Sequence, residues 1–177
     1  MRSFLLIGSV GMLAACSVTP QIGGSGTGAS AATPTGATSL PPNAKVVYVT
    51  DGDTIGVEVD GVEERVRLIG IDTPETNKPN TPVQCFGPEA TAFTKSLLPD
   101  GTSLHIERDV EARDVYGRLL AYVYRSEDGM FVNMEIIGRG YARPLTIAPN
   151  VAHAEEFVTA ARDAEATDAG LWAGCTG

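Results

Sequence analysis

The sequence predicts an α+β domain over residues 45–177, built as a small five-stranded β-barrel capped by about three α-helices. Three observations support this fold class. Short segments of alternating apolar residues recur between turn-forming residues, a helical pattern follows the third of them, and further helical patterns lie near the end of the chain. Small barrels have this order of elements. An open α+β sheet fits the same order, and periodicity does not distinguish the two.

Three strands are expected between residues 45 and 71, connected as an antiparallel meander. Apolar side chains alternate from Ile55 to Val59, and the pair Asp60-Gly61 separates this run from the next. An Asp-Gly pair between two alternating runs is typical of a two-residue hairpin turn. The turn-forming sequence TDGD at 50–53 separates the first strand from the second.

A helix is expected at 87–101, where Pro88 stands at a first-turn position and Glu89 follows it. Proline is favoured in the first turn of a helix, and the Pro-Asp-Gly sequence at 99–101 is a strong stop signal. The remaining elements are two alternating segments and two helical segments, at 102–110, 118–125, 132–140 and 153–170.

The first 44 residues are expected to lie outside the folded domain. Residues 1–16 contain one arginine, then an apolar run, then small residues, which is the layout of a signal peptide. Their ending, Leu-Ala-Ala-Cys, resembles the lipobox of bacterial lipoproteins. Cys16 would then be the lipidated N-terminus that anchors an exported protein to a membrane of the cell envelope. A plain signal peptide, which would leave the protein fully secreted, is the alternative. Residues 17–44 carry no charged residue and are expected to form a flexible tether.

Charge and cysteine content limit the classes of function. The net charge is −9, which disfavours strong non-specific attraction to polyanions, so a nucleic-acid role would need a local site. The predicted domain contains two cysteines, Cys85 and Cys175. In an exported protein an even pair indicates a disulfide, with two free buried thiols as the alternative. A cysteine-based metal site would need more ligands.

Charged residues gather at predicted strand ends and turns. Each has an ordinary explanation when taken alone, such as closing a turn or continuing a strand face. Together they suggest a catalytic site, because aspartates supply hard oxygen ligands for Ca²⁺ or Mg²⁺ and arginines match phosphate oxygens. A divalent ion, a carboxylate and two arginines are the components needed to hydrolyse a phosphodiester. The residues are Asp53, Arg67, Asp72, Glu75 and Arg118.

Four segments resemble motifs of the staphylococcal nuclease (thermonuclease) family, in that family's order and spacing. The resemblance covers nearly all of 45–172 and implies a five-stranded OB-fold barrel with three helices. It also implies calcium-dependent cleavage of DNA and RNA to 3′-phosphate products, and we expect a monomer that prefers single strands. The segments are DGDT at 51–54, RLIGIDTPET at 67–76, FGPEATAFTKSLL at 86–98 and DVYGRLLAYVY at 114–124, followed by VN at 132–133 and GYA at 140–142.

The resemblance also implies a role for individual residues. It implies Ca²⁺ binding by the Asp53 and Asp72 carboxylates and the Thr73 backbone carbonyl, action of Glu75 as general base or water orienter, phosphate binding by Arg67 and Arg118, and a place for Tyr116 beside the nucleotide's phosphate.

Two substrate-binding positions depart from the family pattern. Val115 replaces a lysine, and the region from Leu145 to Ile147 has no aromatic residue where the family's type enzyme has a base-stacking tyrosine. We therefore expect intact chemistry with weaker substrate binding. The alternative is a non-catalytic OB-fold module that binds a single strand or a protein. The retained carboxylates and arginines disfavour that alternative, as does the lack of aromatics for stacking.

Overall fold

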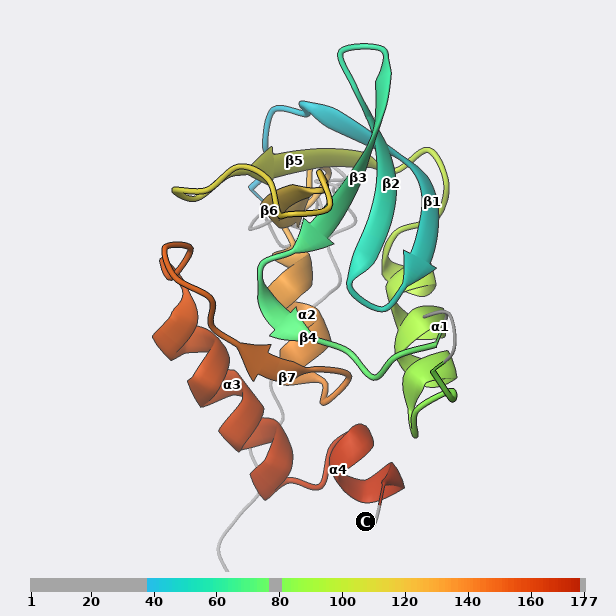
Figure 1. The fold of residues 1–177 in the computed structure, drawn as a ribbon, viewed down its shortest axis with the longest axis vertical. Helices are drawn as coiled ribbons and strands as arrows, with labels where there is room; N and C mark the ends of the chain where they lie inside the picture. Colours follow the sequence, from blue (N-terminus) through green and yellow to red (C-terminus); the bar gives the residue numbers. More distant parts are fainter. Residues whose placement is uncertain (1–37, 77–80, 176–177) are drawn as a thin grey trace, which may run out of the picture. The chain divides into compact units, whose positions relative to one another are not determined.

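The computed structural model describes residues 38–76 and 81–175, and a closed β-barrel lies at its centre (Figure 1). The strand order around the barrel is β1-β2-β3-β6-β5. The closed barrel confirms the predicted fold class over the open sheet. The five strands are β1 (Ala44–Asp51), β2 (Thr54–Val59), β3 (Val62–Leu68), β5 (Ser103–Glu107) and β6 (Leu119–Arg125).

Antiparallel pairing begins with the meander that the sequence predicts. Asp60 and Gly61 have φ angles of 51° and 79° at the β2–β3 turn, the conformation that favours Asp-Gly in tight hairpins. The barrel closes through a parallel pairing of β3 with β6, in which Arg67 lies opposite Leu120. This pairing places the end of β3 beside the beginning of β6.

The helices cover the barrel where apolar side chains need burial. Figure 1 shows α2 between β6 and α3, with α1 alongside β1. Ile136 and Ile137 of α2 are fully buried, as is almost all of Phe157 of α3. Only glycine fits at position 70, because an added Cβ would lie 2.2 Å from the Phe157 ring. The helices are α1 (Gly87–Leu97), α2 (Val132–Gly138), α3 (Ala154–Ala166) and α4 (Leu171–Gly174).

A second, two-stranded sheet is absent from the sequence prediction. It pairs β4 (Gly70–Asp72) with β7 (Arg143–Leu145). Strands of three residues are too short to show alternation. Through β4 the chain leaves the barrel and runs directly to the segment that carries Asp72, Thr73 and Glu75. The predicted last helix, 153–170, ends earlier than expected, at Ala166, and the short helix α4 that follows Gly170 (φ of 57°) lies beyond the predicted range.

The folded unit begins slightly before the predicted start at residue 45. The Leu40 amide donates to the Ser126 carbonyl, and the Asn43 amide donates to the Leu104 carbonyl, both at 2.9 Å. The predicted signal peptide, Cys16 and most of the predicted tether lie outside the described residues. Within the part that is described, no helix has the length and apolarity needed to cross a membrane.

A disulfide joins Cys85 and Cys175, which are 90 residues apart in the sequence. It is the bond expected from the cysteine content. Cys85 lies just before α1, and Cys175 directly follows α4. The bond therefore ties the C-terminal helix to the segment that returns the chain from Glu75 to α1.

Candidate active site

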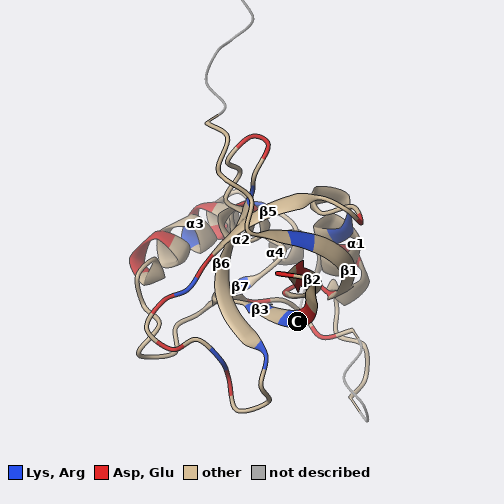
Figure 2. Ribbon diagram, turned by 90° about the horizontal axis from the view of Figure 1, so that it is seen from above, with Lys and Arg blue, Asp and Glu red and all other residues tan. Residues whose placement is uncertain are grey.

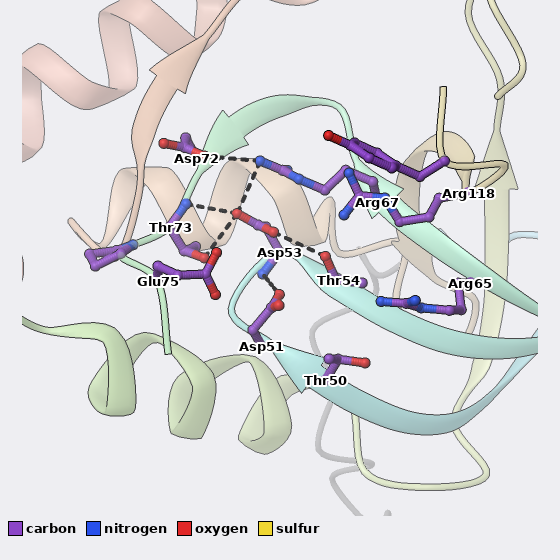
Figure 3. Close-up of a pocket in the computed structure, with 12 residues that line it drawn as sticks. Thr50, Asp51, Asp53, Thr54, Arg65, Arg67, Asp72, Thr73, Glu75 and Arg118 are labelled. Atoms are coloured by element: carbon purple, nitrogen blue, oxygen red, sulfur yellow. Dashed lines mark hydrogen bonds and ion pairs between the residues drawn. The ribbon is translucent and has the colours of Figure 1, made fainter. Parts of the chain in front are cut away.

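A pocket of about 470 Å³ opens where the β1–β2 turn, β3 and the end of β4 meet (Figure 3). It contains all the charged residues that the sequence analysis selected, together with Thr73 and Tyr116. Its lining also includes residues that the analysis did not select. The full set is Thr50, Asp51, Asp53, Thr54, Arg65, Arg67, Asp72, Thr73, Pro74, Glu75, Tyr116 and Arg118.

Asp53 is buried in the β1–β2 turn and holds Thr73 in place. Its Oδ2 accepts hydrogen bonds from the Thr73 amide at 2.8 Å and from the Thr73 hydroxyl at 2.9 Å. Gly52 makes this approach possible, since an added Cβ would lie 2.7 Å from the Thr73 side chain. The Gly52 carbonyl in turn accepts a hydrogen bond from the Thr94 hydroxyl of α1 at 2.7 Å. Helix α1 therefore supports the turn that carries Asp53.

Arg67 lies between two carboxylates. Its Nη2 is 3.2 Å from Oδ2 of Asp53 and 3.0 Å from Oδ1 of Asp72, and Figure 3 shows both interactions. Its Nη1 donates to the carbonyls of Leu68 and Ile71, each at 2.8 Å. The guanidinium is therefore held in one orientation at the edge of the pocket.

Asp51 lines the pocket and belongs to the DGDT segment at 51–54, but it is not among the site residues predicted from the sequence. Burial, followed by the negative charge of Asp53, raises the pKa of Asp51 from 3.8 to about 6. One of its oxygens accepts a hydrogen bond from the Asp53 amide at 3.3 Å. Two neighbouring carboxylates in a buried turn concentrate negative charge, and such a site favours a cation. The Asp-Gly-Asp sequence at 51–53 is the feature of the sequence from which Asp51 could have been predicted as a site residue.

Glu75 is fixed through its backbone by Gln84, another residue that the sequence analysis missed. The Glu75 amide donates to Oε1 of Gln84 at 2.8 Å, and the Gln84 amide donates to the Glu75 carbonyl at 2.9 Å. Gly87 permits the return of the chain, because an added Cβ would lie 2.9 Å from the same carbonyl. Gln84 precedes the disulfide-bonded Cys85, so covalent and hydrogen-bonded restraints act on one segment. No local pattern marks Gln84.

Arg118 reaches the pocket from the beginning of β6 and is oriented by Asp114. Its Nε donates to Oδ2 of Asp114 at 2.7 Å, and its amide donates to Oδ1 at 2.9 Å. Burial raises the pKa of Asp114, but the Arg118 hydrogen bonds outweigh it and hold the pKa below the ordinary value. The Asp114 carbonyl accepts from the Gly117 amide at 3.0 Å. Asp114 and Gly117 could have been recognised in the sequence as the first and fourth residues of a β-turn, where aspartate and glycine are favoured.

Tyr116 is 81% exposed beside the pocket. Its ring centre lies 5.6 Å from the guanidinium carbon of Arg118. An adjoining, mainly apolar pocket of about 340 Å³ shares Tyr116, Arg118 and Arg67 with the first, and Val115, Leu145 and Ile147 also line it. Those three are the positions where the sequence departs from the family pattern.

The oxygen donors suit a hard cation in chemistry, although they are not arranged as a closed cage. No cluster of three or more His, Cys, Asp or Glu side chains is placed to hold a metal ion within residues 38–76 and 81–175. Arg67 lies between the carboxylates of Asp53 and Asp72. The neighbouring carboxylates of the buried Asp53 and the partly buried Asp51 are the observation that fits a divalent cation here, since they gather negative charge on hard oxygens.

The fold and the pocket define the class of protein, which is an OB-fold barrel with carboxylates and arginines gathered at one site. The family model for staphylococcal nuclease homologues matches residues 65–174. The chain is 43% identical over 128 residues to the thermonuclease of Staphylococcus hyicus, covering 72% of this chain and 74% of that one. It is 39% identical over 135 residues to endonuclease YncB of Bacillus subtilis, covering 72% and 63%. The chain belongs to the staphylococcal nuclease family.

Proposed function

We propose that this protein is a nuclease that hydrolyses phosphodiester bonds of DNA and RNA as a monomer. The observation that supports this most strongly is the convergence of Arg67, Arg118 and Glu75 on one pocket that also contains Asp53 and Asp72. The relatives named thermonuclease and endonuclease support the same activity.

The proposed chemistry assigns separate tasks to three side chains. The guanidinium groups of Arg67 and Arg118 bind the oxygens of the scissile phosphate and stabilise the charge that grows on the pentacoordinate phosphorus. Glu75 orients the attacking water and accepts its proton as the new P–O bond forms. The P–O5′ bond then breaks, the leaving 5′ oxygen takes up a proton from solvent water to become a hydroxyl, and the phosphate stays on the 3′ side. Removing one such donor typically costs about 3–4 kcal/mol of transition-state stabilisation.

The proposed cofactor is Ca²⁺, held by the carboxylates of Asp53 and Asp72 and by the Thr73 carbonyl. When bound, it supplies Lewis-acid polarisation of a phosphate oxygen. Because Arg67 bridges the two carboxylates in the structure, we expect its guanidinium to exchange a carboxylate for a phosphate oxygen when the site is loaded. Asp51 adds negative charge beside Asp53 and thereby favours cation binding.

The experiment incubates the purified domain with single-stranded DNA or RNA in Ca²⁺, with and without a chelator. We expect cleavage only when Ca²⁺ is free, products with 3′-phosphate ends, and loss of cleavage in the Glu75→Gln variant. Equal cleavage with and without chelator would contradict the calcium requirement. Binding of single strands with no cleavage in either tube would favour the non-catalytic OB-fold module.

We also propose that the protein is exported and anchored to a membrane of the cell envelope through a lipid on Cys16. The layout of residues 1–16 and the Leu-Ala-Ala-Cys ending support this proposal. Fractionation of cells should find the protein with the membrane and the Cys16→Ser variant outside it. Recovery of the unaltered protein free in the medium would favour plain secretion.

A further inference from the structure

Arg65 lines the candidate active site without a role in the chemistry proposed above. It lies on β3 two residues before Arg67, and side chains at that spacing point to the same face of a strand. Figure 3 shows its side chain near Thr54 and Thr50, on the side of the pocket away from Asp72. Arg65 is exposed and forms no hydrogen bond or ion pair with the rest of the described chain. It is a cation available to a ligand.

Tyr48 lies in the same row across the sheet. The strand register pairs Tyr48 with Gly56 and Gly56 with Arg65, so the three residues cross β1, β2 and β3 in line. The Tyr48 ring lies flat over Gly56, where an added Cβ would be 2.4 Å from the ring. Partial burial, followed by the nearby Glu63 carboxylate, raises the pKa of Tyr48. Because Gly56 has no side chain, the Tyr48 ring can lie on the surface of the sheet, in the same row as Arg65.

We propose that Arg65 and Tyr48 form a further binding subsite for the nucleotide next to the scissile phosphate. Arg65 binds the adjoining phosphate, and Tyr48 stacks on the base. The inference rests on the proposed nuclease function and extends it to the substrate class, a single-stranded polynucleotide rather than an isolated diester. Guanidinium groups match phosphate oxygens, and aromatic rings stack on any base. The strand 2–3 face of OB-folds is a general surface for oligonucleotides.

The extent of this subsite is set by two glutamates. Glu58 pairs with Glu63 one step farther from the pocket on the same face as Gly56 and Arg65. Figure 2 shows blue, basic segments on β3 and at one end of β6, whereas red, acidic segments are prominent along α3. The negative charges of Glu58 and Glu63 repel the phosphates of a polynucleotide that extends beyond Arg65. The subsite therefore accommodates one nucleotide, and a base can reach Tyr48 only when it is not held in a duplex.

The test compares Arg65→Gln and Tyr48→Ala with the unaltered protein on a dinucleotide and on an octanucleotide of single-stranded DNA. We expect KM for the octanucleotide to rise about fivefold or more with kcat unchanged, and KM for the dinucleotide to stay the same. Arg65→Gln should also reduce the slope of log KM against log salt concentration by about 0.7. Gly56→Ala, which displaces the ring, should reproduce Tyr48→Ala, and Tyr48→Phe should behave like the unaltered protein.

Arg162→Gln is the matched control, because Arg162 is an exposed arginine on α3 outside the pocket. Equal losses on both substrates, or no loss on either, would overturn the proposal. Thermal melting of each variant separates misfolding from lost binding, and Arg65→Lys gives a second, milder substitution. If no protein cleaves any substrate, the proposed function fails. Fluorescence anisotropy with the same oligonucleotides then still decides whether Arg65 and Tyr48 bind a strand.

Discussion

Single residues at the candidate site are packed so closely that one added carbon would disturb them. Gly52 is the clearest case, since the Thr73 side chain lies where a Cβ would be. Thr73 is also the residue whose amide and hydroxyl both donate to Asp53. The geometry of Asp53 and Thr73 thus depends on a residue with no functional group.

Gly52→Ala should therefore reduce activity through Thr73. We expect Thr73 to move away from Asp53, with a loss of about 1–3 kcal/mol of stability from overpacking and weaker Ca²⁺-dependent cleavage. Urea unfolding and cleavage assays at several Ca²⁺ concentrations measure the two effects. Gly138→Ala is the matched control, because nothing lies within 4 Å of its added Cβ. Equal behaviour of the two variants would contradict the argument.

Asp114 offers a second test at this scale, because it orients Arg118 without facing the reacting phosphate. Replacing its carboxylate in Asp114→Asn should reduce kcat by roughly 10- to 100-fold, since a hydrogen bond to a charged group contributes about 1.5–3 kcal/mol. Steady-state kinetics give the measurement. Asp128→Asn removes a similar partner from Arg125, outside the pocket, and should leave kcat unchanged. A comparable loss in both variants would mean that the effect is not on Arg118.

At the scale of elements, a buried side chain joins α2 to the strands that carry the site. Asn133 is fully buried. Its Oδ1 accepts from the Val123 amide at 2.9 Å, and its Nδ2 donates to the Ile69 carbonyl at 2.9 Å. Ile69 lies between β3 and β4, so α2 is fastened to the point where the chain leaves the barrel for Asp72.

Asn133→Ala should therefore destabilise the fold by about 2–4 kcal/mol, because it leaves buried backbone groups unpaired. Chemical denaturation measures the change in the free energy of unfolding. Asn43 is an exposed asparagine with similar bonds to Ile106, and Asn43→Ala should cost less. An equal or smaller loss in Asn133→Ala would show that this connection is unimportant.

At the scale of the whole molecule, the disulfide closes a loop that includes most of the folded chain. Replacing Cys85 and Cys175 by serine should lower the free energy of unfolding by about 4 kcal/mol, through the larger entropy of the unfolded chain. Unfolding of the oxidised, reduced and doubly substituted proteins checks this value. The reduced and substituted proteins should agree with each other. An unchanged midpoint on reduction would contradict it.

Acid stability is a second property of the whole molecule. The hydrogen bond from Arg125 lowers the pKa of Asp128 below its ordinary value of 3.8. An acid with a lowered folded-state pKa contributes stability above its ordinary pKa and loses that contribution as pH falls through the folded value. Asp109 behaves alike, because the Ala152 amide and the Tyr122 hydroxyl outweigh its burial. We expect the midpoint of unfolding to fall as the pH drops below 3.8.

The measurement is thermal unfolding over a pH series, with Asp128→Asn for comparison. That variant should show a shallower decline on the acid side. Asp51 acts in the opposite direction between 3.8 and about 6, because burial and Asp53 raise its pKa, so the comparison is made below this range. An identical decline in both proteins would exclude Asp128 as a contributor.

The sequence by itself determined the local elements and the identity of the charged residues. Alternation, the Asp60-Gly61 turn and the helix signals depend on neighbouring residues, and the structure has strands and helices at those places. The motifs selected Asp53, Arg67, Asp72, Glu75 and Arg118 because each lies at a strand end or turn, and all five line one pocket.

Only the tertiary structure decided which residues meet. The parallel pairing of β3 with β6 brings the end of β3, which carries Arg67, to the start of β6, which Arg118 directly precedes. The strand register places Arg65 in line with Tyr48. Gln84 reaches Glu75 only because the chain folds back before α1. The physical reason is that strand pairing and packing join residues that are distant in the chain, and local periodicity carries no information about such partners.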